Sequence, residues 1–271
     1  MTALAPSIPF RRPRLVSAEV LKLRKRRGLV ATAGLLTVVA ILITYAILIS
    51  LHAANPAHHG PAGGITNLGH TLWLLNALGS VAAILIGATA GAGDLGAGVF
   101  RELVVTGRSR SSLFAARIPG GLAVVVAFVG SAYALSAVAS VAFAGSLAAP
   151  STSLLVTGGL WVLLMTGFWF AVALGLSSFL GSRTTPIAVL LPFHLALSPI
   201  LIGIAVLGSG RDALPMAAGD NLLPHAVSSV AAATKDGPGM AALTSVLVLV
   251  LGLWVVVSLA VGLWRTKTRD A

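Results

Sequence analysis

Six long apolar runs, each without Asp, Glu, Lys or Arg, limit this chain to a membrane-spanning fold. The first run is 23 residues long, so a helix rising about 1.5 Å per residue can cross a hydrocarbon core of about 30 Å. Signal peptides have shorter apolar cores of about 7–15 residues, so we expect the first run to be retained. Only 9% of the residues are charged, against about 25% in soluble domains. The runs cover residues 29–51, 72–92, 118–144, 154–180, 187–208 and 241–264.

The fold class follows because lipid offers no hydrogen bonds to a polypeptide backbone. Helices satisfy their backbone groups internally, and apolar runs of this length predict helices rather than strands. We therefore expect an all-α integral membrane protein with six transmembrane helices over residues 29–264. A basic tail with an interfacial helix precedes this domain at 1–28, and a second basic tail follows at 265–271.

The basic residues predict the orientation, because short loops rich in Lys and Arg stay in the cytoplasm. With the N-terminus inside, cytoplasmic segments hold 16 of the 18 basic residues: eight before residue 29, four in 93–117, Arg183 and three in the last tail. Arg211 and Lys235 are left outside. Both termini are expected in the cytoplasm, and the abundance of Ala, Gly and Arg favours a bacterial inner membrane. The net charge of +11 does not indicate nucleic-acid binding, because these cations flank apolar spans and suit anionic lipid.

The segment before the first span has the pattern of a helix that lies in the membrane interface. Val16, Val20 and Leu23 recur at i, i+4 and i+7 and form an apolar stripe. The cations are expected on the opposite face, near anionic headgroups, and a merely solvated basic segment is the alternative. The charged residues assigned to this helix are Glu19, Lys22, Arg24, Lys25 and Arg26.

A polar island at 93–117 separates the second and third apolar runs and predicts a short amphipathic helix. Its apolar residues share one helix face, which is expected to lie against the membrane domain. Gly107 suits the position just past the helix end, where a left-handed backbone is needed. The apolar face consists of Val99, Phe100, Leu103 and Val104, and the exposed face of Arg101 and Glu102.

This island carries a resemblance to a known family. The run Gly-x-Phe-Arg-x-Leu-x-x-x-Gly-Arg-Ser-Arg at 98–110 follows an acidic residue at the end of the second span and precedes a basic residue that leads into the third. The pattern resembles the permeases of type-2 ATP-binding-cassette (ABC) exporters. The topology of the whole chain agrees, but the specific residues lie in 94–117. The resemblance implies a coupling helix that docks on a separate ATPase, through Asp94, Val99, Phe100, Arg101, Glu102, Leu103, Arg108 and Arg110.

The resemblance also implies partners and a mechanism. Such permeases work as dimers, so a second permease chain, identical or related, and two ABC ATPase subunits are expected. ATP and Mg would bind to those subunits, because this chain has no Gly-x-x-x-x-Gly-Lys-Ser/Thr phosphate loop, and no cofactor or catalysis is expected on it. The expected activity is alternating-access export of an amphipathic or hydrophobic substrate. A membrane scaffold is the alternative, and a secondary carrier is disfavoured because carriers use intramembrane carboxylates.

The fifth span and the segment after it contain the candidate gate. Interior prolines kink helices, and an intramembrane histidine is a functional candidate by default. Asp220 or Asn221 is expected to cap a short helix that reaches Val230 and dips back over the outer mouth. The alternatives are a static bend at the prolines, a neutral histidine hydrogen-bonded inside the bundle at His194, and an ordinary surface loop. The candidate gate residues are Pro192, His194, Pro199, Leu222 and Leu223.

Other motifs have simpler explanations. The histidines assigned to the loop between the first two spans are irregularly spaced and lack a carboxylate, so we expect no metal site. The GxGxxG at 91–96 closes a span and lacks the βαβ context of a dinucleotide fingerprint. Small residues that let helices approach in lipid are expected in the second and third spans. The residues concerned are His52, His58, His59 and His70 for the loop, Gly87 and Gly91 for the second span, and Ala132, Ser136, Ser140 and Ala144 for the third.

Overall fold

The computed structural model describes residues 12–96, 98, 100–105, 109–227 and 244–268. Within these ranges all the secondary-structure elements are helices. Six helical spans in the described part of the chain are long and apolar enough to cross a membrane. The expected all-α fold with six helices of membrane-spanning length is therefore confirmed, and it is compatible with a multi-pass membrane protein.

Three spans are continuous helices, and each of the other three contains one π-helical turn. The continuous spans are α7 (Arg110–Ala142), α8 (Thr152–Leu180) and α13 (Thr244–Thr268). The interrupted spans are α2–η1–α3 (Arg27–Gly34, Leu35–Val39, Ala40–Ala54), α4–η2–α5 (Gly64–Leu74, Leu75–Gly79, Ser80–Gly96) and α9–η3–α10 (Thr184–Pro192, Phe193–Leu197, Ser198–Gly203). Shorter helices outside the spans are α1 (Arg12–Arg24), α6 (Phe100–Val105), the 3-10 helix η4 (Ala205–Ala213) and α11 (Pro215–Asn221).

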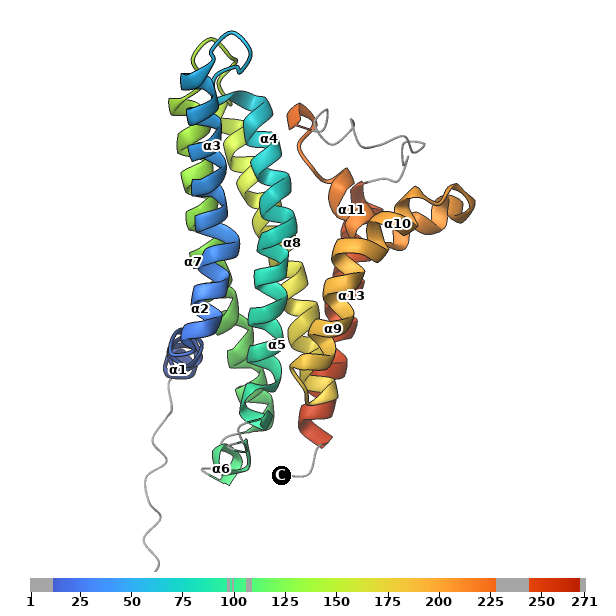
Figure 1. Cartoon of the computed structure of the whole chain (residues 1–271). Coiled ribbons are helices and arrows are strands. Elements are labelled where there is room, and N and C mark those ends of the chain that lie inside the picture. The colour runs from blue at the N-terminus through green and yellow to red at the C-terminus, as the bar shows by residue number, and fades with distance from the viewer. Residues whose placement is uncertain (1–11, 97, 99, 106–108, 228–243, 269–271) are drawn as a thin grey trace, which may run out of the picture.

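The spans form a bundle with two inner members, α4–η2–α5 and α8. In each of these two, 72% of the most apolar 18-residue stretch is buried, against 17–28% in the other four. α8 packs against α5 and against α13, which connects the two sides of the bundle (Figure 1). The outer spans therefore turn most of their apolar surface outward, as helices that face lipid do.

Glycines let the inner helices approach one another closely. A Cβ atom added at Gly87 or Gly91 of α5 would collide with the backbone of α8. The predicted GxxxG is thus a helix-packing motif. Gly175 of α8 and Gly262 of α13 meet in the same way, a contact that the sequence analysis did not single out.

The small-residue stripe predicted for the third span also faces the bundle interior. Ala132, Ser136 and Ser140 are fully buried. The hydroxyl groups of Tyr45 in α3 and Thr71 in α4 hydrogen-bond to the two serines. Because an unpaired hydroxyl in hydrocarbon is costly, these bonds help to hold three spans together.

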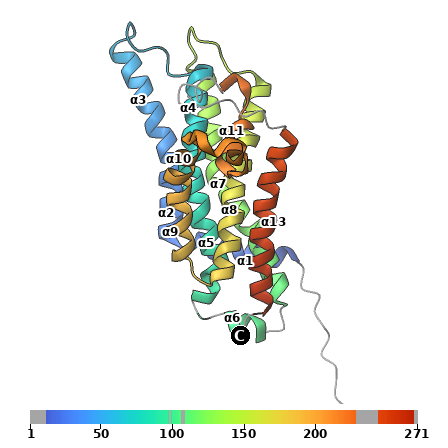
Figure 2. The same cartoon turned by 90° about the vertical axis from the view of Figure 1, so that its right-hand side faces the viewer.

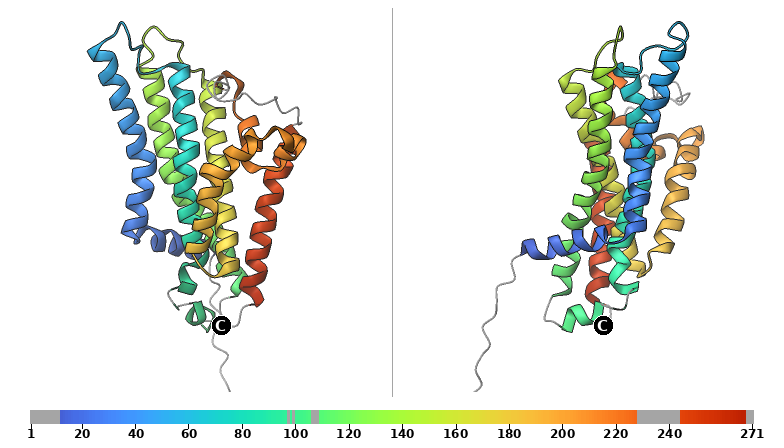
Figure 3. Two further views of the ribbon diagram at one scale, coloured as in Figure 1. Left: turned by 45° about the vertical axis from the view of Figure 1, so that its right-hand side comes forward. Right: turned by 60° about the vertical axis from the view of Figure 1, so that its left-hand side comes forward.

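α1 lies across the bundle axis, at the end where α6 and the C-terminus are found (Figure 3). We call this end of the molecule, formed by α1, α6, the starts of α2, α7 and α9 and the last turns of α5 and α13, the basic end. Val20 and Leu23 of α1 pack against the core, and Arg24 and Lys25 are exposed, as predicted. Lys22 was predicted on the exposed face, but its amine turns inward, because a buried carboxylate of α5 attracts it.

At the end of the bundle opposite the basic end, two span boundaries lie five or more residues from the predicted ones. The second span begins at Gly64 rather than 72, because Asn67 hydrogen-bonds to backbone carbonyls at the helix start and its polarity does not end the helix. His70 consequently lies on α4, and His52 in the last turn of α3, rather than on a loop. The fifth span ends at Gly203 rather than 208, where the backbone turns extended.

At the basic end the helices extend past the apolar runs. Asp94 lies in α5 and Arg117 in α7. The apolar runs are free of charged residues, but the helices that contain them are not. This difference places two opposite charges inside the folded bundle.

Gly91→Ala tests the close α5–α8 contact. The new Cβ atom would meet the carbonyl oxygen of Leu174 and the hydroxyl of Ser177, so we expect the unfolding free energy to fall by about 1–3 kcal/mol. Gly252→Ala in α13 is the matched control, because nothing lies within 4 Å of that Cβ position. The control should be neutral or stabilising by up to about 1 kcal/mol. SDS titration in mixed micelles measures both, and equal stabilities would contradict the packing role.

Candidate functional site

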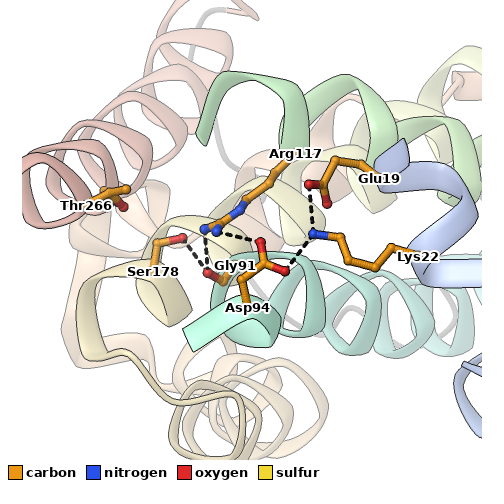
Figure 4. A network of polar contacts seen from close by, with 8 residues as sticks. Glu19, Lys22, Gly91, Asp94, Arg117, Ser178 and Thr266 are labelled. Atoms are coloured by element: carbon orange, nitrogen blue, oxygen red, sulfur yellow. Dashed lines mark hydrogen bonds and ion pairs between the residues drawn. The ribbon is translucent and has the colours of Figure 1, made fainter. Parts of the chain in front are cut away.

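Asp94 contacts two cations inside the basic end (Figure 4). Its Oδ2 accepts a hydrogen bond from Arg117 Nη2 at 3.0 Å, and its Oδ1 accepts one from Lys22 Nζ at 2.7 Å. Lys22 Nζ also donates to Glu19 Oε1 at 2.8 Å. Arg117 Nη1 donates to the carbonyl oxygen of Gly91 at 2.8 Å. We call Glu19, Lys22, Asp94 and Arg117 the ion cluster.

The ion cluster is formally neutral and largely withdrawn from water. Arg117 is 1% exposed and Asp94 is 4% exposed. Leaving one buried charge without its partner costs several kcal/mol, so the members depend on one another. The cluster joins α1, α5 and α7, because its residues come from all three helices. Asp94, which the resemblance assigns to ATPase coupling, thus pairs with cations of its own chain.

Glu19 is held where α1 rests directly on α7. A Cβ atom added at Gly120 of α7 would collide with the Cβ atom of Glu19, so the glycine makes room for α1. Burial raises the pKa of the Glu19 carboxyl above its ordinary value of 4.5, and the hydrogen bond from Lys22 opposes part of that rise. Glu19 was assigned to the interfacial helix from the sequence, and it links that helix to the bundle.

A further contact joins the last turn of α13 to the start of α7. Arg110 Nη1, at the start of α7, donates to the carbonyl oxygen of Lys267 in the last turn of α13 at 3.0 Å. A cation at a helix C-terminus is favourable, because the last carbonyl groups carry partial negative charge. Arg110, which the resemblance assigns to ATPase coupling, thus contacts the last helix of its own chain.

α6 lies in the loop between α5 and α7, beyond the ends of the spans (Figure 1). The helix predicted in the polar island is confirmed at Phe100–Val105. Glu102 is exposed, as predicted, and Val104 is half-buried. Val99, Gly107 and Arg108 lie outside the described residues, as do the side chains of Phe100, Arg101 and Leu103.

The two helices on either side of the loop that carries α6 are therefore joined to each other by the ion cluster. Asp94 stands near the end of α5, just before the loop, and Arg117 stands two turns into α7, just after it. Their direct ion pair connects the two helices that flank the loop. A displacement of α6 relative to the bundle would act on α5 and α7 together, and on α1 through Lys22.

His194, predicted as a candidate gate residue, lies in a second polar cluster within the spans. It is 3% exposed, and its ring lies 4.6 Å from the Trp169 ring, centroid to centroid. Neither nitrogen of His194 makes a well-aligned hydrogen bond to a described residue, but the backbone of Asn76 and Ala77 in the second span lies close to the ring. The Ser198 hydroxyl one turn on has no partner among the described residues. Asn76 Oδ1 and the Ser80 hydroxyl on the second span are buried in the same unpartnered state. Pro192 ends α9 and Pro199 is the second residue of α10, with the π-helical turn η3 between the two helices.

The segment after the fifth span packs back against the bundle. It contains α11, a helix that was not predicted, and residues 225–227, within the range predicted to be helical, also form helix. α11 begins at Pro215 and ends at Asn221, which was expected near the start of the predicted helix. Leu222 is half-buried and Leu223 is 8% exposed, just after the helix. Val230 lies outside the described residues. Figure 2 shows α11 across the bundle between α9 and α13.

α11 is fixed against the middle of α8. Trp161 Nε1 donates to the carbonyl oxygen of Gly219 at 2.8 Å. The Met165 side chain occupies the space beside Gly219 that a Cβ atom would need. Trp169, two turns further along α8 from Trp161, contacts His194. One face of α8 therefore supports both parts of the candidate gate.

Arg211, one of the two basic residues assigned to the outer side from the sequence, is buried against its own chain. Its Nε donates to the carbonyl oxygen of Gly208 at 3.0 Å and its Nη1 to that of Ile202 at 3.2 Å. Ile202 belongs to the last turn of α10, so the guanidinium serves as a cap for that helix.

The sequence analysis missed Arg117 as a site residue. The signal that could have identified it is the position of Asp94 and Arg117 at the ends of adjacent spans, which antiparallel helices bring to the same level. No such signal exists for Lys22, because 72 positions separate it from Asp94 in the sequence. No protein-family model and no curated protein matches the chain.

Charge balance in the ion cluster predicts a non-additive pair of substitutions. Asp94→Asn leaves one excess positive charge and Arg117→Gln one excess negative charge, so each should lower the unfolding free energy by about 3–5 kcal/mol. The double variant restores neutrality and should lose less than the sum, by about 0.5–3 kcal/mol. Arg265→Gln, an exposed cation at the same end, is the control and should change stability by under about 0.5 kcal/mol. Additive losses in an SDS titration would show that the pair is not coupled.

Proposed function

We propose that the protein is the permease subunit of an ATP-driven ABC exporter, with both termini in the cytoplasm. The proposal rests on the ion pair that joins α5 and α7, the two helices on either side of α6. A short helix with an exposed acidic residue lies beyond the membrane spans, and the helices before and after it are joined by a buried ion pair. Such an arrangement can pass force from an aqueous partner to the spans.

The distribution of charge supports the cytoplasmic assignment of the basic end. Exposed cations gather there on four separate elements, and short segments rich in Lys and Arg remain in the cytoplasm. A soluble ATPase in the cytoplasm would therefore meet α6. The exposed cations are Arg24 and Lys25, Arg27, Arg183, and Arg265 and Lys267.

The energy source in this proposal is a separate chain. The sequence holds no phosphate loop for ATP, and its apolar runs hold no carboxylate of the kind that ion-coupled carriers use. ATP binding and hydrolysis on two ATPase subunits would move α6 in each of two permease chains. The cargo would be amphipathic or hydrophobic, because the spans offer few charged side chains to accompany a strongly charged one.

The candidate gate fits alternating access. Buried polar groups without partners destabilise the packed state, and π-helical turns often mark functional sites. The cluster around His194 joins the fifth span to α8 and the second span, and α11 rests on α8 nearby. A rearrangement of the fifth span would therefore alter the contacts that hold α11 against α8.

Charge reversal on α6 tests the proposal. Arg101→Glu or Glu102→Arg replaces attraction with repulsion at a docked surface, so association with an ABC ATPase subunit that co-purifies with this chain should fall tenfold or more, by roughly 1.5–3 kcal/mol. Lys267→Glu, an exposed cation at the same end but outside α6, is the matched control and should retain association. A pull-down and an ATPase assay in one detergent preparation measure both effects.

Membrane insertion and the nucleotide affinity of the isolated ATPase should be unchanged by either substitution, because α6 lies outside the spans. Full association and full hydrolysis in both α6 variants would contradict the coupling role and favour a membrane scaffold without transport.

A further inference from the structure

A cavity at the basic end contains arginines that the ion cluster does not use. It has a volume of about 460 Å³ and lies where α5 ends and α9 begins. A second hollow of about 490 Å³ extends from it between α2, α5 and α9. The two share Arg26, Arg183 and Thr184, so they form one continuous site with α5 between α2 and α9 (Figure 1).

The charge of this site is entirely positive. Arg26, Arg27 and Arg183 line it, and no lining residue is acidic. None of the three arginines makes an ion pair within the part of the chain that the structure describes. This contrasts with the ion cluster nearby, where two carboxylates balance two cations. Three arginines without counter-charges favour an anion from outside the chain.

The local backbone leaves room for such an anion. A Cβ atom at Gly93 would lie 2.9 Å from Arg26 Nη2, so the glycine lets the guanidinium lie against α5. Gly96 and Gly181 also line the cavity and add no side chain to it. The N-terminus of α9 opens onto the same space, and helix N-termini carry partial positive charge.

The second hollow supplies an apolar continuation. Leu29, Leu85 and Ile187 line it, and they come from three spans. The arginines stand at or just outside the first residues of the first and fifth spans, where phospholipid headgroups lie. The site thus has a cationic mouth at headgroup level and an apolar groove that leads into the membrane, which matches the shape of a phospholipid.

We propose that this site binds the phosphate group of an anionic phospholipid through Arg26, Arg27 and Arg183, with an acyl chain along Leu29, Leu85 and Ile187. The bound lipid would bridge α2 and α9, two spans that lie on either side of α5. The site depends on the membrane setting of the six spans and not on ATP-driven transport, so it stands even if the coupling role of α6 fails.

Lipid binding to the purified full-length chain tests the proposal. Native mass spectrometry in detergent, with dioleoyl phosphatidylglycerol or dioleoyl phosphatidylcholine as the probe, measures the affinity of each lipid. The wild type should prefer phosphatidylglycerol, and Arg26→Gln with Arg183→Gln should weaken its binding by about tenfold or more. Arg26→Lys with Arg183→Lys should keep most of the preference, because the charge remains.

Two controls make the result specific. Arg265→Gln with Lys267→Gln removes two exposed cations from the same end outside the cavity, and should leave the preference unchanged. Helical circular dichroism and gel-filtration elution confirm that each variant is folded. A folded glutamine variant with undiminished preference for phosphatidylglycerol, or a wild type without that preference, would overturn the proposal.

Inorganic phosphate distinguishes a lipid from a soluble ligand. If the headgroup and acyl chain act together, millimolar phosphate should displace little phosphatidylglycerol. Binding of phosphate alone that is lost in the glutamine variant, together with no preference between the two lipids, would assign the site to a soluble phosphate and overturn the lipid assignment.

Discussion

The contact of Asp94 with Arg117 and Lys22 is the interaction on which the basic end depends. Lipid cannot solvate charge, so a carboxylate in a membrane helix is stable only when cations reach it. Here one cation comes from α7 and the other from α1, and Glu19 supplies the second negative charge. The resulting neutrality permits three helices to meet at one point. The loop carrying α6 is consequently held at both of its ends.

Away from the basic end, the bundle contains one buried polar region whose groups are hydrogen-bonded and one in which several groups lack such bonds. Tyr45, Ser140 and their neighbours hydrogen-bond one another between α3, α4 and α7. Around His194 several buried polar atoms lack well-aligned hydrogen bonds, and the π-helical turns η2 and η3 supply several of them. Satisfied polar groups specify one packing, whereas unsatisfied ones lower the cost of leaving it. The hydrogen-bonded groups between α3, α4 and α7 therefore favour one packing more strongly than the groups around His194 do.

The sequence predicts the six spans and α6, because both follow from local patterns of apolar and polar residues. It does not predict where Lys22 points, since the nearest apolar stripe places that residue on the exposed face. Its partner Asp94 is far away in the sequence, and only the packing of α1 on α7 at Gly120 brings them together. Likewise, the sequence patterns did not indicate α11, which begins at Pro215, and Asp220, expected to cap the following helix, lies near the end of α11 instead. Local signals give the elements, while tertiary contacts decide which charges pair.

The claim that the ion cluster fixes α1 on the bundle has a direct test by electron paramagnetic resonance. The chain contains no cysteine, so spin labels can be placed at Leu21→Cys on α1 and Trp264→Cys on α13, both exposed positions. Double electron–electron resonance should give one narrow distance distribution in this background and a broad one when Asp94→Asn is added. The same narrow distribution in both proteins would contradict the account, because α1 would then be held without the ion cluster.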